Sequence, residues 1–459
     1  MRNGAPEQHR RPAGHEADRP RAVWWLHPGS VALFLGVPLL IVAYLLPEDS
    51  YLVLYRSQKH IDASFLINGL VVYVAFVAGT FAVFGTGGRA RPRPQWKDVL
   101  AYCRAFVWPL FVLTVLAYVA WFGYAAALHS LGTVTQALLD VVLARDVGTS
   151  SYVKKELFVT LPGLTTITQC GILYVTIEAL LWVRGASDRR LALARFAMVL
   201  GLALVRALLL SERLALVELV IPIAVVFVTS GTISRLAYRG LVRLAPVFAG
   251  VGVFGVFAVG EYFRSWNFYQ SVYSGPYLRF AAERFLGYYA TAVNNGAVIY
   301  YYEPIQPLRY TFQSLLEFPI LGDTVYSLYA QTFGEDYIDY TLLLETYANP
   351  EFNNTALVGL LLSEYSLFLA PVAGFLLGLL SVTLYNSFLN GRLVGILLYP
   401  SFFVGVLEIS RIYYWSAERY FPTLAFLLLS LLLFRIMKVP AGGSSFRRNL
   451  RKTVGSAER

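Results

Sequence analysis

The fold is decided by residues 196–230, FAMVLGLALVRALLLSERLALVELVIPIAVVFVTS, in which two apolar runs meet at a turn of three residues, Ser211-Glu212-Arg213. A helix needs about 20 predominantly apolar residues to cross the hydrocarbon core of a bilayer. Similar runs recur along the chain, so that hydrophobic residues make up 57% of it and charged residues only 14%. Soluble proteins contain about 25% charged residues. The composition therefore predicts an all-α polytopic membrane protein.

The apolar runs predict about ten transmembrane helices, at 30–46, 63–85, 105–128, 159–183, 196–210, 214–230, 244–260, 365–388, 393–409 and 421–436. The polar residues at the start of the chain are rich in Arg and Pro, which is typical of disorder. The predicted organisation has five parts: a disordered cytoplasmic N-terminus (1–28), transmembrane helices 1–7 (29–260), an extracytoplasmic Tyr-rich loop (261–352), transmembrane helices 8–10 with an entry helix (353–436) and a basic cytoplasmic tail (437–459).

The basic residues predict the orientation, because Lys and Arg gather in cytoplasmic connectors. With a cytoplasmic N-terminus, 25 basic residues fall on the cytoplasmic side and 12 on the opposite side. Both termini are therefore predicted to be cytoplasmic and the long loop to lie outside. The net charge of +10 does not indicate a nucleic-acid partner, because the basic residues are spread over short connectors at a lipid bilayer.

The long loop is rich in tyrosine, with fifteen between residues 262 and 347. Tyrosine suits the bilayer interface, and its flat apolar face with a hydroxyl also suits sugar rings. The candidate substrate-binding tyrosines are Tyr288, Tyr289, Tyr300 and Tyr301, and an interfacial belt is the alternative interpretation. Helical spacing over 277–295 and 310–334 predicts amphipathic helices that lie on the surface, the first with an i,i+4 pair between Arg279 and Glu283.

Arg206 lies inside an apolar run, and an intramembrane arginine marks a functional site by default. Arg206 and Arg213 are predicted catalytic residues, because two guanidinium groups near the outer leaflet suit a lipid pyrophosphate. Two alternatives stay open. Arg206 can snorkel to the outer head groups, or Glu212 and Glu218 can pair with these arginines.

The outer loops supply the remaining candidates. The predicted catalytic carboxylates are Glu303, Asp336 and Glu345, each placed where a carboxyl could act as a base. The predicted substrate-binding arginines are Arg264, Arg279, Arg284, Arg309, Arg411 and Arg419. The sequence indicates no metal site and no cofactor, since it has no Walker-type loop, HExxH or CxxC motif. Gly374 and Gly378, four residues apart in one span, predict close helix packing.

The arginine turn, the long outer loop and an Asn-rich entry to a glycine-rich span resemble the Wzy-type oligosaccharide repeat-unit (O-antigen) polymerases. The matching pieces are LSERLAL at 210–216, YYATAVNNG at 288–296, FNNT at 352–355, LSEY at 362–365 and Gly374. Family members often have an Asp-Phe-Gly-like step where this chain has Glu364-Tyr365-Ser366. The resemblance runs from about residue 196 to 390, and its pieces add Asn294 and Asn353 to the predicted substrate-binding residues.

The resemblance implies an inverting, metal-independent glycosyltransferase of the bacterial inner membrane. The growing glycan would leave one undecaprenyl pyrophosphate and be joined to the sugar of another. Arg206 and Arg213 would neutralise the departing pyrophosphate, and a loop carboxylate would take the proton of the acceptor hydroxyl. The implied partners are undecaprenyl-pyrophosphate-linked oligosaccharide and, as a further candidate, a chain-length regulator.

Other functions stay open beside the polymerase. An O-antigen ligase uses the same lipid donor, but that family characteristically carries a functional histidine in its large outer loop, and this loop has none. A transporter or flippase for lipid-linked glycans would line a transmembrane path with charges, whereas here most ionisable residues fall at the outer end. Another lipid-linked-sugar glycosyltransferase is the third alternative.

Overall fold

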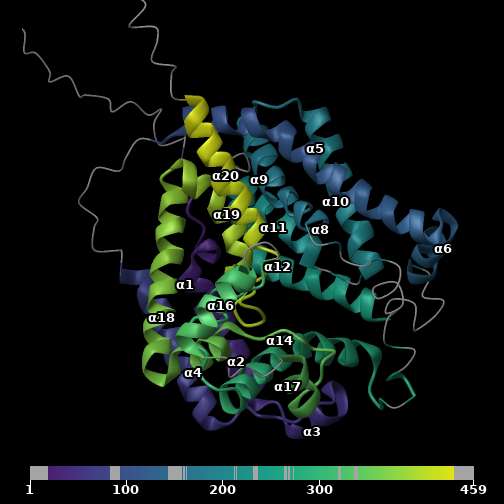
Figure 1. Cartoon of the computed structure of the whole chain (residues 1–459), viewed down its shortest axis with the longest axis vertical. Coiled ribbons are helices and arrows are strands. Elements are labelled where there is room, and N and C mark those ends of the chain that lie inside the picture. Colours follow the sequence, from purple (N-terminus) through teal and green to yellow (C-terminus); the bar gives the residue numbers. More distant parts are fainter. Residues whose placement is uncertain are drawn as a thin grey trace, which may run out of the picture.

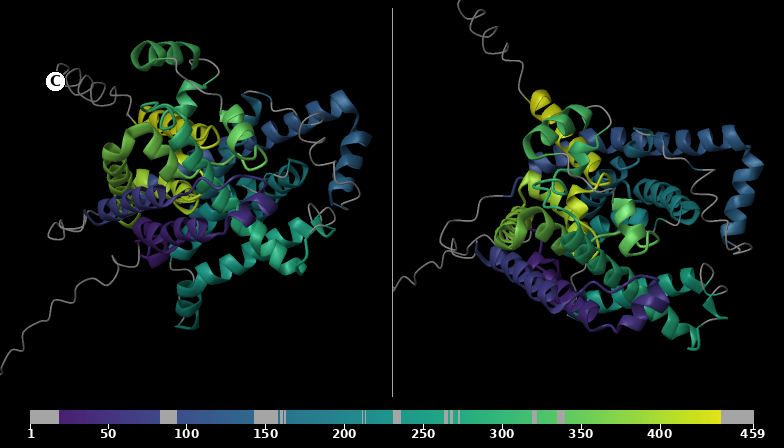
Figure 2. Two further views of the ribbon diagram at one scale, coloured as in Figure 1. Left: turned by 90° about the horizontal axis from the view of Figure 1, so that it is seen from below. Right: turned by 60° about the horizontal axis from the view of Figure 1, so that its bottom comes forward.

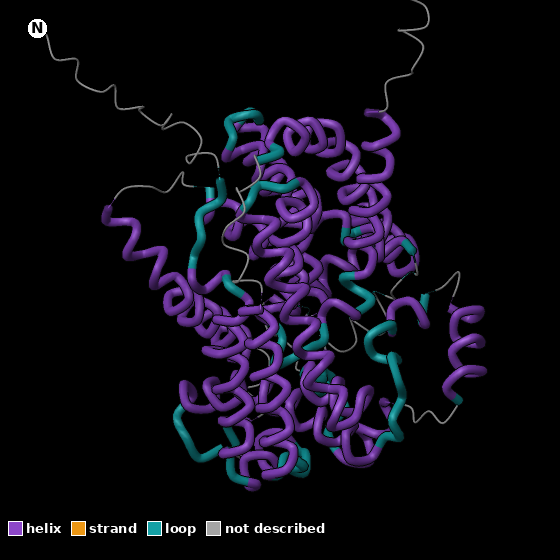
Figure 3. Tube along the Cα trace, turned by 90° about the vertical axis from the view of Figure 1, so that its left-hand side faces the viewer, coloured by secondary structure: helices purple, strands orange, loops and turns teal. Residues whose placement is uncertain are grey.

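The computed structural model describes residues 19–82, 94–142, 158, 161, 163–210, 212, 214–230, 236–262, 266, 269–271, 273–318, 322–334 and 340–438. Helices make up 80% of the structure, and the described residues contain no strand (Figure 3). The predicted all-α class is confirmed. The predicted tails before residue 19 and after residue 438 lie outside the described residues.

Seven helical runs in the described part are long and apolar enough to cross a membrane. They are Pro28–Leu45 (α1 Pro28–Val31, η2 Ala32–Gly36 and α2 Val37–Leu45), α4 (Ala63–Phe81), α5 (Trp96–His129), Leu164–Val183 (α8 Leu164–Ile167 and α9 Cys170–Val183), α10 (Arg189–Leu210), Val242–Glu261 within α12 (Leu236–Glu261) and α18 (Leu357–Leu389). Three shorter apolar helices accompany them: α11 (Leu214–Thr229), α19 (Leu393–Leu407) and α20 (Phe421–Lys438). Each predicted apolar segment coincides with one of these helices, which indicates a multi-pass membrane protein.

The ends of the helices sort to two ends of the molecule. The backbone N–H of Arg21 donates to the carbonyl of Thr229 at the end of α11 (2.8 Å). Tyr102 in the first part of α5 hydrogen-bonds to Ser430 in the middle of α20 (2.5 Å). α20 ends at the top of Figure 1, whereas α14 (Tyr277–Tyr302) and α17 (Tyr340–Tyr347) lie at the bottom. Both described chain ends therefore lie opposite the Tyr-rich stretch, as the predicted topology requires.

The last part of the predicted disordered N-terminus is ordered. Residues 19–27 run across the helix ends and include the short helix η1 (Trp24–Leu26), in which Leu26 is fully buried. The indole N–H groups of Trp24 and Trp25 donate to the carbonyls of Arg243 (3.2 Å) and Val242 (2.9 Å). The aromatic and apolar residues that precede the first span thus anchor this segment, which corrects the predicted boundary at residue 28.

α4 and α18 pack with their backbones close together. A Cβ added at Gly374 or Gly378 would collide with the backbone carbonyl of Val72 or Phe76 in α4, so the two backbones are in direct contact there. Gly79 of α4 meets α18 in the same way. The prediction that Gly374 and Gly378 serve close helix packing is confirmed.

α14 departs from the predicted surface-lying helix. Its residues from Ala290 to Ile299 are all buried, and it packs against α2, α12 and α18. The approach to α18 depends on two glycines, since a Cβ at Gly359 would overlap the backbone of Gly296. The run of small residues, not the tyrosines, decides the position of this helix. The predicted ion pair at its start is present, with Arg279 Nε 2.9 Å from Glu283 Oε1.

α18 is broken near its start. Ser366 has φ 59° and ψ 176° inside an otherwise helical run, a backbone conformation that is essentially restricted to glycine. The first segment, up to Tyr365, is buried throughout its first two turns, and the longer second segment packs on α4. A short buried helix therefore precedes the break at Ser366, at the place where an entry helix was predicted.

The remaining helices are short or peripheral. They are α3 (Glu48–Ser50), η3 (Tyr51–Tyr55), α6 (Leu131–Val142), α15 (Gln313–Leu316), α16 (Gly322–Phe333) and η7 (Tyr414–Ser416). The second predicted loop helix is thus divided into α15 and α16. Figure 2 shows α5 extending beyond its neighbours and turning sharply into α6. With 34 residues, α5 is about 50 Å long, well above the roughly 30 Å of a hydrocarbon core.

Candidate functional site

The predicted site residues that the structure describes come from several separate elements. Three predicted residues, Arg213, Arg264 and Asp336, lie outside the described residues. Glu345 is exposed on α17. The others are drawn into several separate groups of contacts. Each group is held by a different part of the fold.

Arg206 is almost completely buried, with 7% of its surface exposed. Its Nε and Nη2 atoms donate to Glu212 Oε2 at 3.1 and 2.8 Å, and its Nη1 donates to Thr168 Oγ1 at 3.1 Å. Its guanidinium carbon lies 5.2 Å from the ring centroid of Trp121. All three nitrogen atoms of the guanidinium therefore have protein partners.

Arg419, from the connector before α20, joins the same group. Its Nε and Nη2 donate to the two oxygens of Glu218 at 3.1 Å each, and its Nη1 donates to Glu212 Oε2 at 3.0 Å. Burial alone would raise the pKa of Glu212, but the guanidinium groups of Arg419 and Arg206 outweigh it and hold that pKa below its ordinary value. Two arginines and two glutamates form a neutral group, called here the arginine network. The alternative that a glutamate pairs with Arg206 therefore holds for Glu212, whereas Glu218 pairs with Arg419.

Glu303 ends α14 and is 7% exposed. The hydroxyl of Tyr310 donates to its Oε2, while its Oε1 is buried and has no hydrogen-bond partner among the described residues. Burial raises the pKa of Glu303 to about 7, although Tyr310 and the charge of Arg309 act in the opposite direction. A buried carboxyl that gains and loses a proton near neutral pH is suited to acid–base chemistry.

Glu364, which the sequence did not single out as a catalytic candidate, is 1% exposed in the first segment of α18. It accepts hydrogen bonds from the backbone N–H of Thr311 (2.6 Å) and from Thr311 Oγ1 (2.8 Å). Consecutive residues, Tyr310 and Thr311, therefore hold Glu303 and Glu364, which interact electrostatically. These two glutamates are called here the carboxyl pair. The strained Ser366 follows Glu364 by two residues.

Arg309 connects the two groups. Its charge acts on Glu303 and also on Glu317, whose pKa burial and the neighbouring Glu418 carboxyl raise to about 7. Glu418 directly precedes Arg419 of the arginine network. Arg309 and Glu317 therefore link the carboxyl pair electrostatically to Glu418, the chain neighbour of Arg419.

Of the predicted substrate-binding tyrosines, some pack against other side chains and others are exposed. Tyr300 packs against Phe65, whereas Tyr301 is 41% exposed and donates to Asp62 (2.6 Å). Tyr302 stacks on Tyr347 with ring centroids 3.9 Å apart, and His60 meets Tyr302 edge-on. A histidine and an aspartate from the connector before α4, His60 and Asp62, thus lie against these tyrosines.

Tyr288 and Tyr289 lie on a more buried part of α14. Tyr288 packs edge-on against Phe257 and Phe352, and the guanidinium carbon of Arg411 lies 6.0 Å from its ring centroid. Arg411 in turn pairs with Glu408 at 2.9 Å. These contacts fix the connector after α19 against α14 and leave the two tyrosines less accessible than Tyr301.

Arg284 and Asn294, both predicted to bind substrate, are buried and contact neighbouring segments of the chain. Arg284 is 1% exposed and lies 3.3 Å from Glu351 and 3.7 Å from the fully buried Glu261. Asn294 donates to the carbonyl of Gln58 (2.8 Å) and accepts the backbone N–H of His60 (2.7 Å). Both side chains therefore tie α14 to neighbouring segments, which favours a structural role.

No family model, curated protein or solved structure matches this chain. The functional proposal therefore rests on the geometry of the described residues. The described part brings together a buried carboxyl pair, an arginine at its side and an exposed group of tyrosines. Asn353, another predicted residue, lies beside this region, where its carbonyl accepts the hydroxyl of Tyr340 (3.1 Å).

Proposed function

We propose that the chain is a glycosyltransferase of the bacterial inner membrane that polymerises undecaprenyl-pyrophosphate-linked oligosaccharide repeat units on the outer face. In this proposal the three shorter apolar helices also cross the membrane, which gives ten spans with the Tyr-rich stretch outside. The asymmetry of 25 to 12 basic residues supports this orientation. The position of α14 and α17 opposite the described chain ends supports it as well.

One observation carries the proposal, namely the buried Glu303 whose Oε1 is unpaired and whose pKa is about 7. As a carboxylate, it would take the proton of the acceptor hydroxyl. The acceptor oxygen then bonds to the anomeric carbon of the donor glycan, while the bond from that carbon to the pyrophosphate breaks. The electron pair of that bond stays on the departing phosphate. A base whose pKa lies near the working pH is the most effective one for this step.

The charge that grows on the pyrophosphate needs cationic partners. Arg309 is the candidate we propose, because its charge already acts on Glu303. Arg206 and Arg419 of the arginine network are paired with glutamates. In this proposal Arg206 therefore supports the site, and the direct contact with phosphate passes to Arg309. The exposed Tyr301 and Tyr302 would hold sugars by stacking.

An O-antigen ligase is the second candidate, and His60 is the observation that favours it. The long loop has no histidine, yet His60 from another connector lies against Tyr302, and its Nε2–H donates to the carbonyl of Tyr347 (2.8 Å). The two functions differ in the acceptor. A polymerase elongates the lipid-linked glycan, whereas a ligase moves it to another lipid.

Replacing Glu303 by glutamine tests the proposal. Glu303→Gln keeps the shape and removes the base, so polymer formation in cells should fall by about a hundredfold or more at matched membrane abundance. Glu345→Gln is the matched control, because it removes an exposed carboxylate from the same stretch and should leave the polymer ladder unchanged. Normal ladders from Glu303→Gln would exclude Glu303 as the base.

A further inference from the structure

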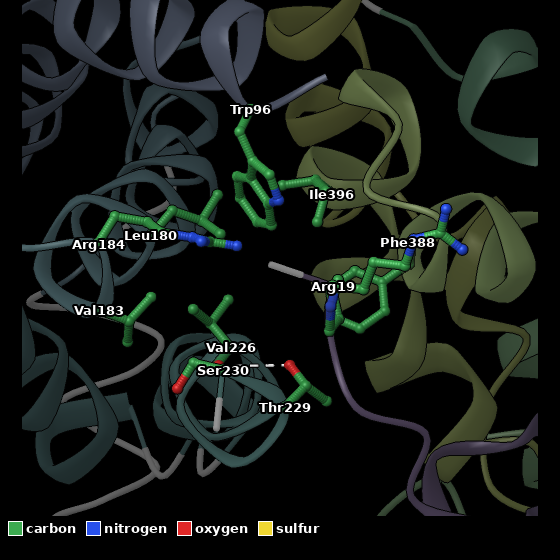
Figure 4. A pocket seen from close by; sticks show the side chains of 11 residues that line it. Arg19, Trp96, Leu180, Val183, Arg184, Val226, Thr229, Ser230, Phe388 and Ile396 are labelled. Atoms are coloured by element: carbon green, nitrogen blue, oxygen red, sulfur yellow. Dashed lines mark hydrogen bonds between the residues drawn. The ribbon is translucent and has the colours of Figure 1, made fainter. Parts of the chain in front are cut away.

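A recess at the end of the molecule that holds the described chain ends is filled by its own side chains. Trp96, Arg184 and Arg19 are among the residues around it (Figure 4). The guanidinium carbon of Arg184 lies 3.5 Å from the ring centroid of Trp96, so these two planar groups stack on each other. Figure 4 shows the guanidinium of Arg19 directed away from the recess, whose enclosed space holds little more than a water molecule. This recess offers no room for a ligand.

Glu364 is a buried carboxyl to which the proposed mechanism gives no role. Both of its oxygens accept hydrogen bonds from Thr311, Oε1 from the backbone N–H at 2.6 Å and Oε2 from the hydroxyl at 2.8 Å. The backbone N–H of Tyr310 also interacts with it. All of these partners can donate, and an ionised carboxylate, which only accepts, satisfies every one of them. The hydrogen bonds of Glu364 therefore favour its ionised form.

The hydroxyl of Thr311 is also the meeting point of two tyrosines. The hydroxyls of Tyr365 and Tyr413 lie 2.9 and 3.4 Å from Thr311 Oγ1. Because the single hydroxyl proton of Thr311 is donated to Glu364, the two tyrosines donate to Thr311. Tyr365 belongs to α18 and Tyr413 to the connector after α19. Two other parts of the fold therefore hold Thr311, and Glu364 is the acceptor at the end of these hydrogen bonds.

Backbone strain flanks the contact between Glu364 and Thr311 on both sides. Leu308, three residues before Thr311, has φ 63°, a left-handed conformation that favours glycine. Ser366, two residues after Glu364, has φ 59° and ψ 176°. A strained backbone persists where the surrounding structure fixes it. The hydrogen bonds between Glu364 and Thr311 join the two strained segments and so help to fix both of them.

The segment that Glu364 fixes also decides which oxygen of Glu303 is free. Tyr310 directly precedes Thr311, and its hydroxyl donates to Oε2 of Glu303. Oε1 of Glu303 is buried and has no hydrogen-bond partner among the described residues. If Thr311 moves, Tyr310 moves with it, and the position of the Glu303 carboxyl is no longer fixed.

Glu364 also acts on Glu303 through its charge. The two carboxyls interact electrostatically, and a negative charge disfavours the ionisation of a second carboxyl near it. Ionised Glu364 therefore makes Glu303 hold a proton more strongly. For a base that takes a proton from a hydroxyl, stronger proton binding is an advantage as long as the base is still ionised near the working pH.

The other titratable groups that face the carboxyl pair keep their charge near neutral pH. They come from every element packed against it: Arg309 and Tyr310 from the segment after α14, Tyr329 from α16, Tyr340 from α17, Tyr365 from α18 and Tyr413 from the connector after α19. Phenols ionise near pH 10 and arginine above about 12. Glu317 titrates near pH 7 as well, but it meets Glu418 and Arg309. Changes of charge within the pair therefore come from Glu303 and Glu364.

We propose that Glu364 is the positioning residue for Glu303. Through Thr311 and Tyr310 it fixes Glu303 with Oε1 free for the acceptor hydroxyl, and its negative charge strengthens Glu303 as a base. This role rests on the proposed function, in which Glu303 takes the acceptor proton. Glu364 itself forms and breaks no bond to the glycan, because both of its oxygens are engaged by Thr311.

The test follows elongation by the purified protein in lipid vesicles from about pH 5.5 to 8.5, measured per folded molecule. Glu364→Gln keeps the shape and removes the charge, so the rate should fall about tenfold and its rise with pH should move down by about one unit. Glu364→Asp keeps the charge but shortens the side chain, so the rate should fall while the rise stays near pH 7. If the rise stays near pH 7 in Glu364→Gln, or the rate is unchanged, the proposal is overturned.

Thr311→Val tests the route through Thr311, because it removes the hydroxyl and keeps the shape and both carboxyls. The rate should fall about tenfold, with its rise close to that of the wild type, and Thr311→Ser should recover most of the loss. Thr346→Val, at an exposed threonine of α17, is the matched control and should leave the rate unchanged. Equal rates in Thr311→Val and Thr346→Val would exclude positioning through Thr311.

Thermal unfolding separates this role from the proposed function. Wild-type stability should fall between about pH 4.5 and 7, the ordinary and the raised pKa of Glu303, because the folded state binds more protons in that range. In Glu364→Gln the fall should end about one unit lower, and adding Glu303→Gln should remove it. A wild-type protein that makes no polymer but shows this shift would reject the proposed function and keep the action of Glu364 on Glu303. A fall that still ends near pH 7 in Glu364→Gln would overturn that action, whether or not polymer is made.

Discussion

At the scale of single residues, burial separates Glu303 from the other acids of the long stretch. From the sequence, Glu303, Asp336 and Glu345 were equivalent candidates for a base. In the fold Glu303 is buried with one unpaired oxygen, whereas Glu345 is exposed. This difference could not be predicted, because it depends on the segment at Tyr310 and Thr311 folding back over the end of α14.

We expect Glu303→Gln to stabilise the folded protein at about pH 8 more than at about pH 5. The pKa of Glu303 is raised to about 7 from its ordinary 4.5, so between these values the folded state binds more protons than the unfolded state. Stability therefore falls as the pH rises through this window, and the full cost of ionising the buried carboxyl, about 3 kcal/mol, is present above it. Glutamine carries no charge and avoids this cost.

Thermal unfolding of the purified protein at the two pH values measures this effect, with Glu345→Gln as the control. An equal loss of stability at both pH values in Glu303→Gln would show that the carboxyl is held ionised by its partners. That outcome would also remove the main physical reason for assigning it as a base.

The arginine network makes a different prediction for Arg206. Arg206→Ala should sharply reduce the amount of folded protein in the membrane, because removing one partner of a buried ion pair costs about 3–5 kcal/mol. Adding Glu212→Gln should recover part of the loss, since it removes the carboxylate left without Arg206. Membrane abundance and thermal unfolding of the single and double variants measure the coupling. A fully stable Arg206→Ala protein that makes no polymer would instead return Arg206 to a direct role on pyrophosphate.

At the scale of the elements, the sequence predicted the apolar helices well and the Tyr-rich stretch less well. Hydrophobic runs of span length leave little freedom, and each of them is a helix in the structure. α14 was expected on the surface because its helical spacing of apolar residues, with an ion pair between Arg279 and Glu283, predicted an amphipathic helix. Its buried face consists of small residues, such as Gly296, whose importance depends on a partner helix that is about sixty residues away in sequence.

The crossing of α14 and α18 gives a prediction at this scale. Gly359→Ala should destabilise the protein by about 1–3 kcal/mol, because its Cβ would overlap the backbone of Gly296. Gly255→Ala in α12 is the matched control, since a Cβ there meets nothing within 4 Å and alanine favours a helix. Thermal unfolding of both variants measures the difference. Equal stability of the two variants would contradict the close approach of these helices.

At the scale of the whole molecule, the proposed site is assembled from distant parts of the chain. Glu364 lies about sixty residues after Glu303, and His60 lies more than two hundred residues before Tyr302. Neither Glu364 nor His60 belongs to the long loop, so the composition of that loop could not indicate them. The resemblance did mark 362–365 as one of its pieces, but it gave Glu364 no role. The sequence indicated a set of candidate residues, and only the fold shows which of their side chains meet.

The central claim is that this chain itself forms glycosidic bonds with Glu303 as the base. The most direct measurement is polymer formation by the purified protein in lipid vesicles supplied only with undecaprenyl-pyrophosphate-linked oligosaccharide, followed from about pH 5.5 to 8.5. We predict products longer than one repeat unit, at a rate that rises with pH through about 7 as Glu303 loses its proton, and at least a hundredfold loss in Glu303→Gln. Absence of any elongated product from a folded wild-type protein, or an unchanged rate in Glu303→Gln, would contradict the account.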